Sequence, residues 1–188
     1  MKNTLILHGK PTRERYENPE IPKPHKANWL PWLSAELGKR GVVTAIPAFP
    51  EPYAPNYDTW SELFDRYGVD QETSIVGHSA GAEFALRWLS EHNRARLRQL
   101  VLVAPWKDTA GKYGDFSHYE LDTQLAKRIG TISIFNSLND SEAIQANVTQ
   151  LRTDLPEAEY VEFRNHGHFM IGNSMQDERF PELLNRLT

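Results

Sequence analysis

The sequence alternates short runs of apolar, often β-branched residues with segments of helical pattern, and this alternation constrains the fold more than any other feature. Several of the apolar runs are continuous, which is typical of strands covered on both faces. Six runs are predicted to be strands: residues 4–7, 42–46, 73–76, 100–104, 131–135 and 160–163.

Four segments between and after these strands have the spacing of helices. The first, residues 28–40, carries Trp29, Leu33 and Leu37 at helical spacing and stops at Gly41. The others are predicted over residues 82–92, 141–151 and 178–187. Because strands and helices alternate throughout, we expect an α/β fold with a mainly parallel sheet, right-handed crossovers and helices on both faces.

Length and composition limit the classes of protein that the chain can belong to. With 188 residues and 39% apolar content it can bury one substantial core, so we expect residues 1–188 to form a single domain. The absence of cysteine excludes disulfides, zinc–thiolate sites and thiol nucleophiles. A formal net charge of −4 gives no general attraction to nucleic acid or anionic membranes.

Nothing in the sequence predicts a targeting or membrane segment. The opening residues 2–7 have the pattern of a strand, and no apolar run approaches the ~18 residues of a membrane span. We therefore expect a soluble cytoplasmic protein with no nucleic-acid or membrane partner. A protein partner is not indicated.

The pentapeptide 77–81, Gly-His-Ser-Ala-Gly, joins the third predicted strand to the second predicted helix. A serine in G-x-S-x-G at such a junction lies on a strained turn, the nucleophile elbow, which exposes its Oγ above the sheet. Ser79 is therefore the candidate nucleophile.

A serine hydroxyl needs a histidine base oriented by a carboxylate, and candidates for both follow in the sequence. Asp140 comes after the fifth strand and His168 after the sixth, so that both lie at the same sheet edge as Ser79. His166 is the alternative base, and Asp108, after the fourth strand, is the alternative acid. His166 and His168 also form a His-x-His pair, but no third metal ligand at recognisable spacing accompanies it.

Two backbone amides are expected to form an oxyanion hole. One is the N–H of Ala80, at the amino end of the helix after Ser79. The second is expected from the turn after the first strand, where Pro11 has no N–H and Lys10 remains. In a sheet of order 2-1-3-4-5-6, the first and third strands are neighbours across the topological switch, which places Lys10 beside Ser79.

Two long connections leave the sheet at the carboxyl ends of strands, where active sites lie. Residues 10–26 are rich in proline, and residues 106–122 contain aromatic residues among glycines. Each is either an ordinary surface excursion or a rim or lid that contacts substrate. The residues predicted to line a substrate pocket are His8, Trp106, Tyr113, Phe116 and Tyr119.

Several motifs together resemble one known family. They are His8-Gly9, the segment 29–33 (Trp-Leu-Pro-Trp-Leu), the strand end 45–47, the pentapeptide 77–81, the strand 100–104, Asn139-Asp140 and Gly167-His168-Phe169. The chain resembles the small serine hydrolases related to retinoblastoma-binding protein 9 over nearly its whole length. The resemblance implies a compact α/β-hydrolase fold without a large cap domain and a triad of Ser79, Asp140 and His168.

The sequence therefore predicts a metal-independent serine hydrolase without a cofactor. It would cleave a small-molecule acyl substrate, namely an ester, thioester or amide, through an acyl-Ser79 intermediate, as a carboxylesterase-like or peptidase-like enzyme. The alternative is a non-catalytic module that binds a protein or a ligand on the same scaffold.

Overall fold

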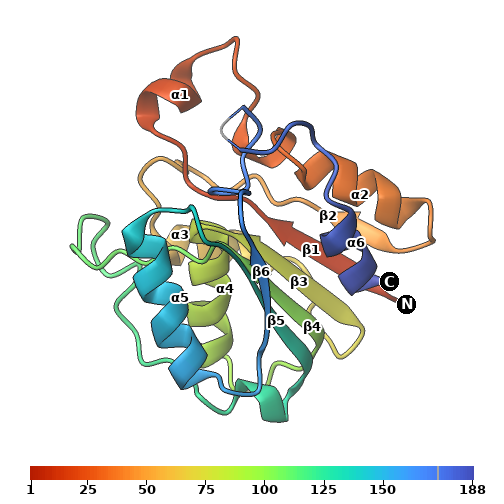
Figure 1. The fold of residues 1–188 in the computed structure, drawn as a ribbon. Coiled ribbons are helices and arrows are strands. Elements are labelled where there is room, and N and C mark those ends of the chain that lie inside the picture. Colours follow the sequence, from red (N-terminus) through yellow and green to blue (C-terminus); the bar gives the residue numbers. More distant parts are fainter. Residues whose placement is uncertain (173) are drawn as a thin grey trace.

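The fold is built on one six-stranded parallel sheet in the order β2-β1-β3-β4-β5-β6. The computed structural model describes residues 1–172 and 174–188 (Figure 1). Its strands are β1 (Asn3–Leu7), β2 (Val43–Ala45), β3 (Thr73–His78), β4 (Leu97–Val103), β5 (Ile129–Ser137) and β6 (Glu159–Phe163). The predicted α/β fold and strand order are confirmed.

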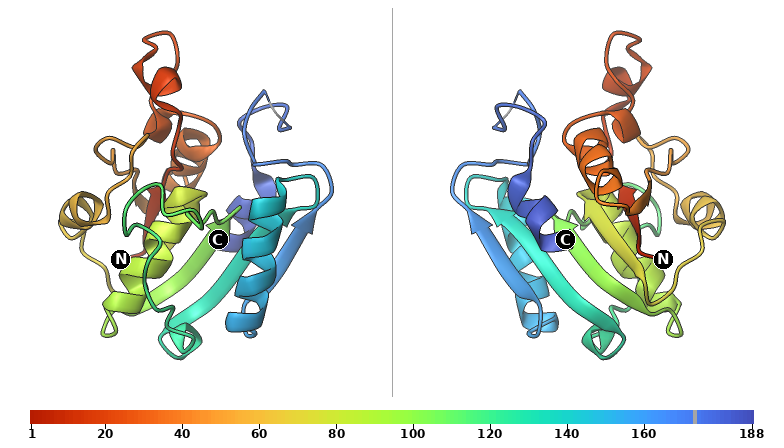
Figure 2. Two further views of the ribbon diagram at one scale, coloured as in Figure 1. Left: turned by 90° about the vertical axis from the view of Figure 1, so that its left-hand side faces the viewer. Right: turned by 90° about the vertical axis from the view of Figure 1, so that its right-hand side faces the viewer.

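Helices cover both faces of the sheet (Figures 1 and 2). Helices α2 (Leu30–Gly38) and α6 (Pro181–Leu187) lie on one face. Helices α3 (Tyr57–Phe64), α4 (Ala80–Glu91) and α5 (Glu142–Asp154) lie on the other. The short helix α1 (Arg13–Glu17) and the 3₁₀ turns η1 (Pro24–Lys26) and η2 (Leu125–Lys127) lie within connections.

The continuous apolar runs are buried because both faces of the sheet are covered. All six residues of β3 are buried, and the last four of β4 are buried as well. The outer strand β2 is only three residues long and leaves Val43 56% exposed, so the core is thickest around β3 and β4.

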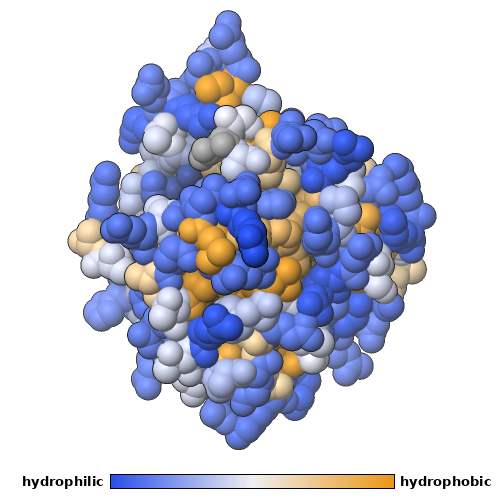
Figure 3. Space-filling view, in the orientation of Figure 1, coloured by the Kyte–Doolittle hydropathy of each residue, from blue (hydrophilic) through white to orange (hydrophobic). Residues whose placement is uncertain are grey.

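The connections after β1 and β6 both rise from the carboxyl end of the sheet (Figure 2). The connection after β1 carries α1 and η1, and the segment after β6 leads to α6. The face shown in Figure 3 is largely hydrophilic, with small separate apolar areas. No helix among the described residues combines the length and apolar character needed to span a bilayer.

Candidate active site

Ser79 lies at the sharp turn between β3 and α4, with backbone angles φ 55° and ψ −118°. Glycines on both sides make this turn sterically feasible. A Cβ at Gly77 would lie 2.5 Å from Ala82 Cα, and one at Gly81 would lie 2.6 Å from the Leu7 carbonyl oxygen. The predicted elbow therefore has a strained serine and two positions that only glycine fits.

The structure brings Ser79, His168 and Asp140 into one hydrogen-bonded chain. His168 Nε2 lies 2.9 Å from Ser79 Oγ, and His168 Nδ1 lies 2.8 Å from Asp140 Oδ2. Because a carboxylate only accepts hydrogen bonds, Nδ1 carries the proton and Nε2 is left to accept from the serine hydroxyl. Three segments far apart in the sequence thus meet in the arrangement required of nucleophile, base and orienting acid.

Asp140 is held with its carboxylate directed at the histidine. Its side chain is 5% exposed, and its other oxygen accepts a 2.7 Å hydrogen bond from the Ser141 N–H. Ser141 in turn caps α5, so the acid lies directly before a helix start. The carboxylate is therefore fixed by backbone geometry as well as by His168.

The segment that carries His168 is fixed by three further contacts. His78 Nε2 lies 2.9 Å from the His168 carbonyl oxygen, and Trp29 Nε1 donates to the Phe169 carbonyl oxygen at 3.1 Å. The Gly167 N–H donates to Asn139 Oδ1 at 2.8 Å. Phe169 has a positive φ of 53°, which costs energy for a residue with a side chain. These contacts hold the base in place despite that strain.

Trp29 and Asn139 were not predicted to support the site. Asn139 directly precedes Asp140, and Trp29 is the residue before α2, but neither position in the sequence indicates which distant carbonyl or amide it reaches. His78 both packs and hydrogen-bonds, since its ring also lies edge-to-face against Trp29.

Two buried histidines next to the site are neutral. Burial lowers the pKa of His78 to about 3 and that of His8 to about 4. His78 donates from Nε2 to a carbonyl, whereas His8 donates from Nδ1 to the Gly9 carbonyl and accepts from the Phe49 N–H at Nε2. Neither adds a positive charge beside the base.

The alternative base and acid have structural contacts instead. The ring of His166 packs against that of Phe163, with 4.4 Å between ring centroids, and its backbone N–H donates to Ser137 Oγ at 2.8 Å. Asp108 accepts a hydrogen bond from the Tyr113 N–H at 2.6 Å. Both residues stabilise loops, and neither is hydrogen-bonded to Ser79 or His168 in the described part of the chain.

The turn after β1 passes close to the nucleophile. β1 and β3 are paired, with Leu7 opposite Gly77, and a Cβ at Gly9 would lie only 2.9 Å from Ser79 Cβ. Lys10 follows immediately, and Ala80 is the first residue of α4. The two predicted oxyanion donors therefore belong to the two backbone segments that flank Ser79.

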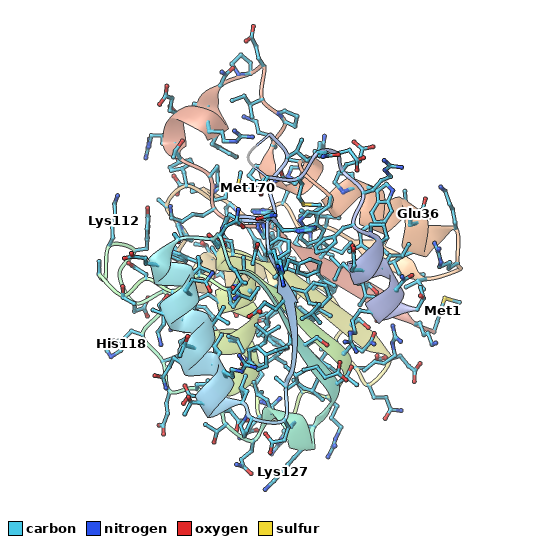
Figure 4. The ribbon with its side chains drawn as sticks, viewed as in Figure 1. Met1, Glu36, Lys112, His118, Lys127 and Met170 are labelled. Atoms are coloured by element: carbon cyan, nitrogen blue, oxygen red, sulfur yellow. The ribbon has the colours of Figure 1, made fainter. Side chains whose placement is uncertain are left out.

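A cavity of about 60 Å³ opens at Ser79 and His168. Most of its wall comes from the connection between β1 and α2, together with Met170, which lies at the carboxyl end of the sheet in Figure 4. Its apolar lining consists of Pro11, Pro22, Pro24, Ala27, Leu30 and Met170. The predicted pocket residue His8 lines this cavity, and residues 10–26 supply contacts as a rim would.

The four aromatic residues predicted for the pocket lie outside its lining. Phe116 is fully buried against Trp60, and Tyr119 donates a 3.4 Å hydrogen bond to Glu83. The rings of Trp106 and Tyr113 pack against the ammonium group of Lys10. Their connection packs onto α4 instead of over Ser79, and Phe116 is buried in the core. Lys112 and His118 of this connection point outward in Figure 4.

Within residues 1–172 and 174–188, no three histidine, aspartate or glutamate side chains are grouped as metal ligands would be. His166 and His168 belong to different surroundings, an aromatic cluster and the hydrogen-bonded chain.

Sequence comparison identifies the family. A profile of the family described as serine hydrolase matches residues 23–188, and the chain belongs to this family. A homoserine O-succinyltransferase from Saccharophagus degradans is 33% identical over 76 residues, which cover 36% of this chain. The chain spans only 20% of the length of that curated relative.

Solved structures share the fold along almost the whole chain. The ydeN gene product from B. subtilis has a TM-score of 0.82 at 23% identity, covering 100% of this chain and 97% of its own. Est1E from Butyrivibrio proteoclasticus, solved with ferulic acid, has a TM-score of 0.66 at 12% identity, with coverage of 100% and 86%. A thioesterase domain from the curacin biosynthetic pathway has a TM-score of 0.63 at 13% identity, with coverage of 99% and 90%. The fold is that of α/β-hydrolases, as predicted.

Proposed function

We propose that this hydrolase cleaves a small ester, thioester or amide through an acyl-Ser79 intermediate, with His168 as general base and Asp140 as orienting acid. The observation that carries the proposal is the unbroken hydrogen-bonded chain from Ser79 Oγ through His168 to Asp140. The motifs of the sequence further support a place among the small hydrolases related to retinoblastoma-binding protein 9.

The proposed reaction begins when Ser79 Oγ attacks the substrate carbonyl carbon and its proton passes to His168 Nε2. Asp140 stabilises the resulting imidazolium through its hydrogen bond to Nδ1. The backbone N–H groups of Lys10 and Ala80 are proposed to stabilise the oxyanion, since both flank Ser79. Collapse of the tetrahedral intermediate breaks the bond to the leaving group, which takes the proton from His168.

Deacylation repeats the sequence with water. His168 Nε2 accepts a proton from water while the water oxygen attacks the acyl carbon. The acid leaves, and Ser79 regains its proton from His168. The cavity at Ser79 is small, about 60 Å³, so short acyl groups are the expected substrates.

Labelling with a fluorophosphonate probe tests the nucleophile. Wild type should be labelled, and Ser79→Ala should lose the label because the phosphonylated oxygen is gone. Ser133→Ala is the matched control: Ser133 is also buried, but it lies within β5 away from the elbow, and this variant should label like wild type. Peptide mapping should locate the adduct on residue 79.

Equal labelling of wild type and Ser79→Ala would refute the assignment. A folded wild-type protein that neither labels nor turns over short aryl esters would instead favour the non-catalytic, ligand-binding alternative.

A further inference from the structure

The cavity at Ser79 is lined by two cationic side chains, Lys10 and Arg15, and by no aspartate or glutamate among the described residues. Arg15 forms no ion pair within the described part of the chain. The ammonium group of Lys10 lies 4.7 Å from the ring centroid of Tyr113, so an aromatic face and not a carboxylate is its neighbour. Arg15 and Lys10 therefore both line the cavity, and neither is paired with a carboxylate of the described residues.

The position of Arg15 is set by the local fold. Its backbone N–H donates to Thr12 Oγ1 at 3.2 Å, which caps α1 and fixes the first turn. The neighbouring cation on the same helix, Arg13, differs: it pairs with Glu17 at 3.5 Å, packs over the ring of Tyr53 and is absent from the cavity lining. The two arginines of α1 thus have separate surroundings.

The charge of the whole connection agrees with that of the cavity. Residues 10–28 contain five lysines and arginines and three glutamates, a net charge of +2, whereas the chain as a whole carries −4. A locally positive wall around a narrow cavity raises the local concentration of anions. Arginine also offers paired donors that match the two oxygens of a carboxylate.

We propose that the natural substrate carries a carboxylate or comparable anionic group a few bonds from the scissile carbonyl, and that Arg15, with Lys10, binds it. This inference rests on the proposed function, since it concerns the substrate class of the same site. Tyr16 also lines the cavity and places a phenol beside Arg15 in the chain. The anionic group can belong to the acyl part or to the leaving group.

Two pairs of esters distinguish these sources. 4-Nitrophenyl hemisuccinate carries its carboxylate on the acyl part. Its neutral partner is 4-nitrophenyl methyl succinate, in which that carboxylate is a methyl ester. 4-Acetoxybenzoate carries the carboxylate on the leaving group, and its neutral partner is methyl 4-acetoxybenzoate. The measured quantity is the ratio of kcat/KM for the anionic ester to that for its neutral partner, from release of the phenol.

In wild type we expect this ratio to exceed about tenfold for at least one pair and to fall as salt is raised. Arg15→Gln should lower the ratio at least about tenfold, and Arg15→Lys should retain part of it. Arg13→Gln, the matched control on the same helix, should keep the ratio within about twofold of wild type.

Ser79-dependent turnover with a ratio near one for both pairs, or a ratio equally reduced in Arg13→Gln and Arg15→Gln, would overturn the inference while leaving the proposed function intact. Loss of Ser79-dependent turnover for all four esters, together with no fluorophosphonate label, would overturn both.

Discussion

At the scale of single residues, strain and hydrogen bonding together define the candidate active site. Ser79 and Phe169 both have positive φ values, 55° and 53°, which cost on the order of 1–3 kcal/mol each. The first lifts the candidate nucleophile from the sheet, and the second turns the chain directly after His168. Hydrogen bonds from His78 and Trp29 hold the segment around Phe169 in this conformation.

The two histidines of the segment 166–168 should differ sharply in their effect on turnover. His168→Ala should lower kcat for a short aryl ester by roughly 10³-fold, because it removes the group bonded to Ser79 Oγ. His166→Ala should lower kcat by less than about tenfold, since its ring contacts Phe163 and not the serine. Steady-state kinetics of both variants checks this, and the reverse ranking would assign the base to His166.

At the scale of elements, the site depends on contact between α2 and the segment after β6. Trp29, the residue before α2, is fully buried and reaches the Phe169 carbonyl over a separation of 140 residues. The residue before α2 thereby holds the loop that carries His168, the candidate base.

Trp29→Phe should lower both stability and turnover. The change leaves the buried Phe169 carbonyl unpaired, at a cost of about 1–3 kcal/mol, and loosens His168, for which we expect kcat to fall about tenfold. Trp88→Phe is the control, since Trp88 also donates from Nε1, to Asp65, but lies on α4 away from the site. Its Tm should fall while kcat stays within about twofold; equal kcat for the two variants would contradict the positioning role.

The elements themselves were largely predictable from the sequence. All six strands follow from apolar runs, because strands covered on both faces need no polar alternation. Helix α3 was not predicted, although Asn56 caps it and Tyr57, Trp60 and Phe64 follow at helical spacing. That signal directly follows Pro50, Pro52 and Pro55, and these prolines indicate a loop. The aromatic residues expected in the pocket lie outside its lining for a related reason. A residue such as Phe116 can line a pocket or belong to the core, and only the packing of the whole fold determines which.

At the scale of the whole molecule, three buried titratable side chains couple folding to pH. His8 and His78 have lowered pKa values, so the stability that they provide is complete above pH 6.5 and is lost as pH falls toward about 4 for His8 and about 3 for His78. Glu83 on α4 behaves oppositely. Burial raises its pKa to about 7, and its stabilising neutral form is lost as pH rises from 4.5 to 7.

Glu83→Gln should therefore gain stability relative to wild type as pH rises. Between pH 4.5 and 7 the difference in free energy of unfolding should shift in favour of the variant by on the order of 3 kcal/mol, because glutamine has no charge to bury. Urea unfolding of both proteins at several pH values measures this difference. A difference that stays constant over the range would show that Glu83 titrates normally in the folded state.

The convergence of the site could be predicted from topology, and its cavity could not. Parallel strands deliver their following loops to one edge, so Ser79, Asp140 and His168 were expected to lie together. The wall of the cavity depends on how residues 10–28 fold back over that edge. The hydrophobic periodicity of the sequence does not predict the path of this connection. Arg13 and Arg15 are two positions apart on a short helix. Only the three-dimensional structure shows that Arg15 lines the cavity and Arg13 does not.

The candidate catalytic residues and the cavity wall come from different parts of the chain, and this separation has an evolutionary consequence. The candidate catalytic residues follow β3, β5 and β6, whereas the connection of residues 11–28 between β1 and α2 supplies most of the cavity wall. Under the proposed function, replacing that connection should change substrate preference and leave Ser79, Asp140 and His168 in place. Preference for a substrate and the ability to cleave it can therefore diverge at independent rates in descendants of this scaffold.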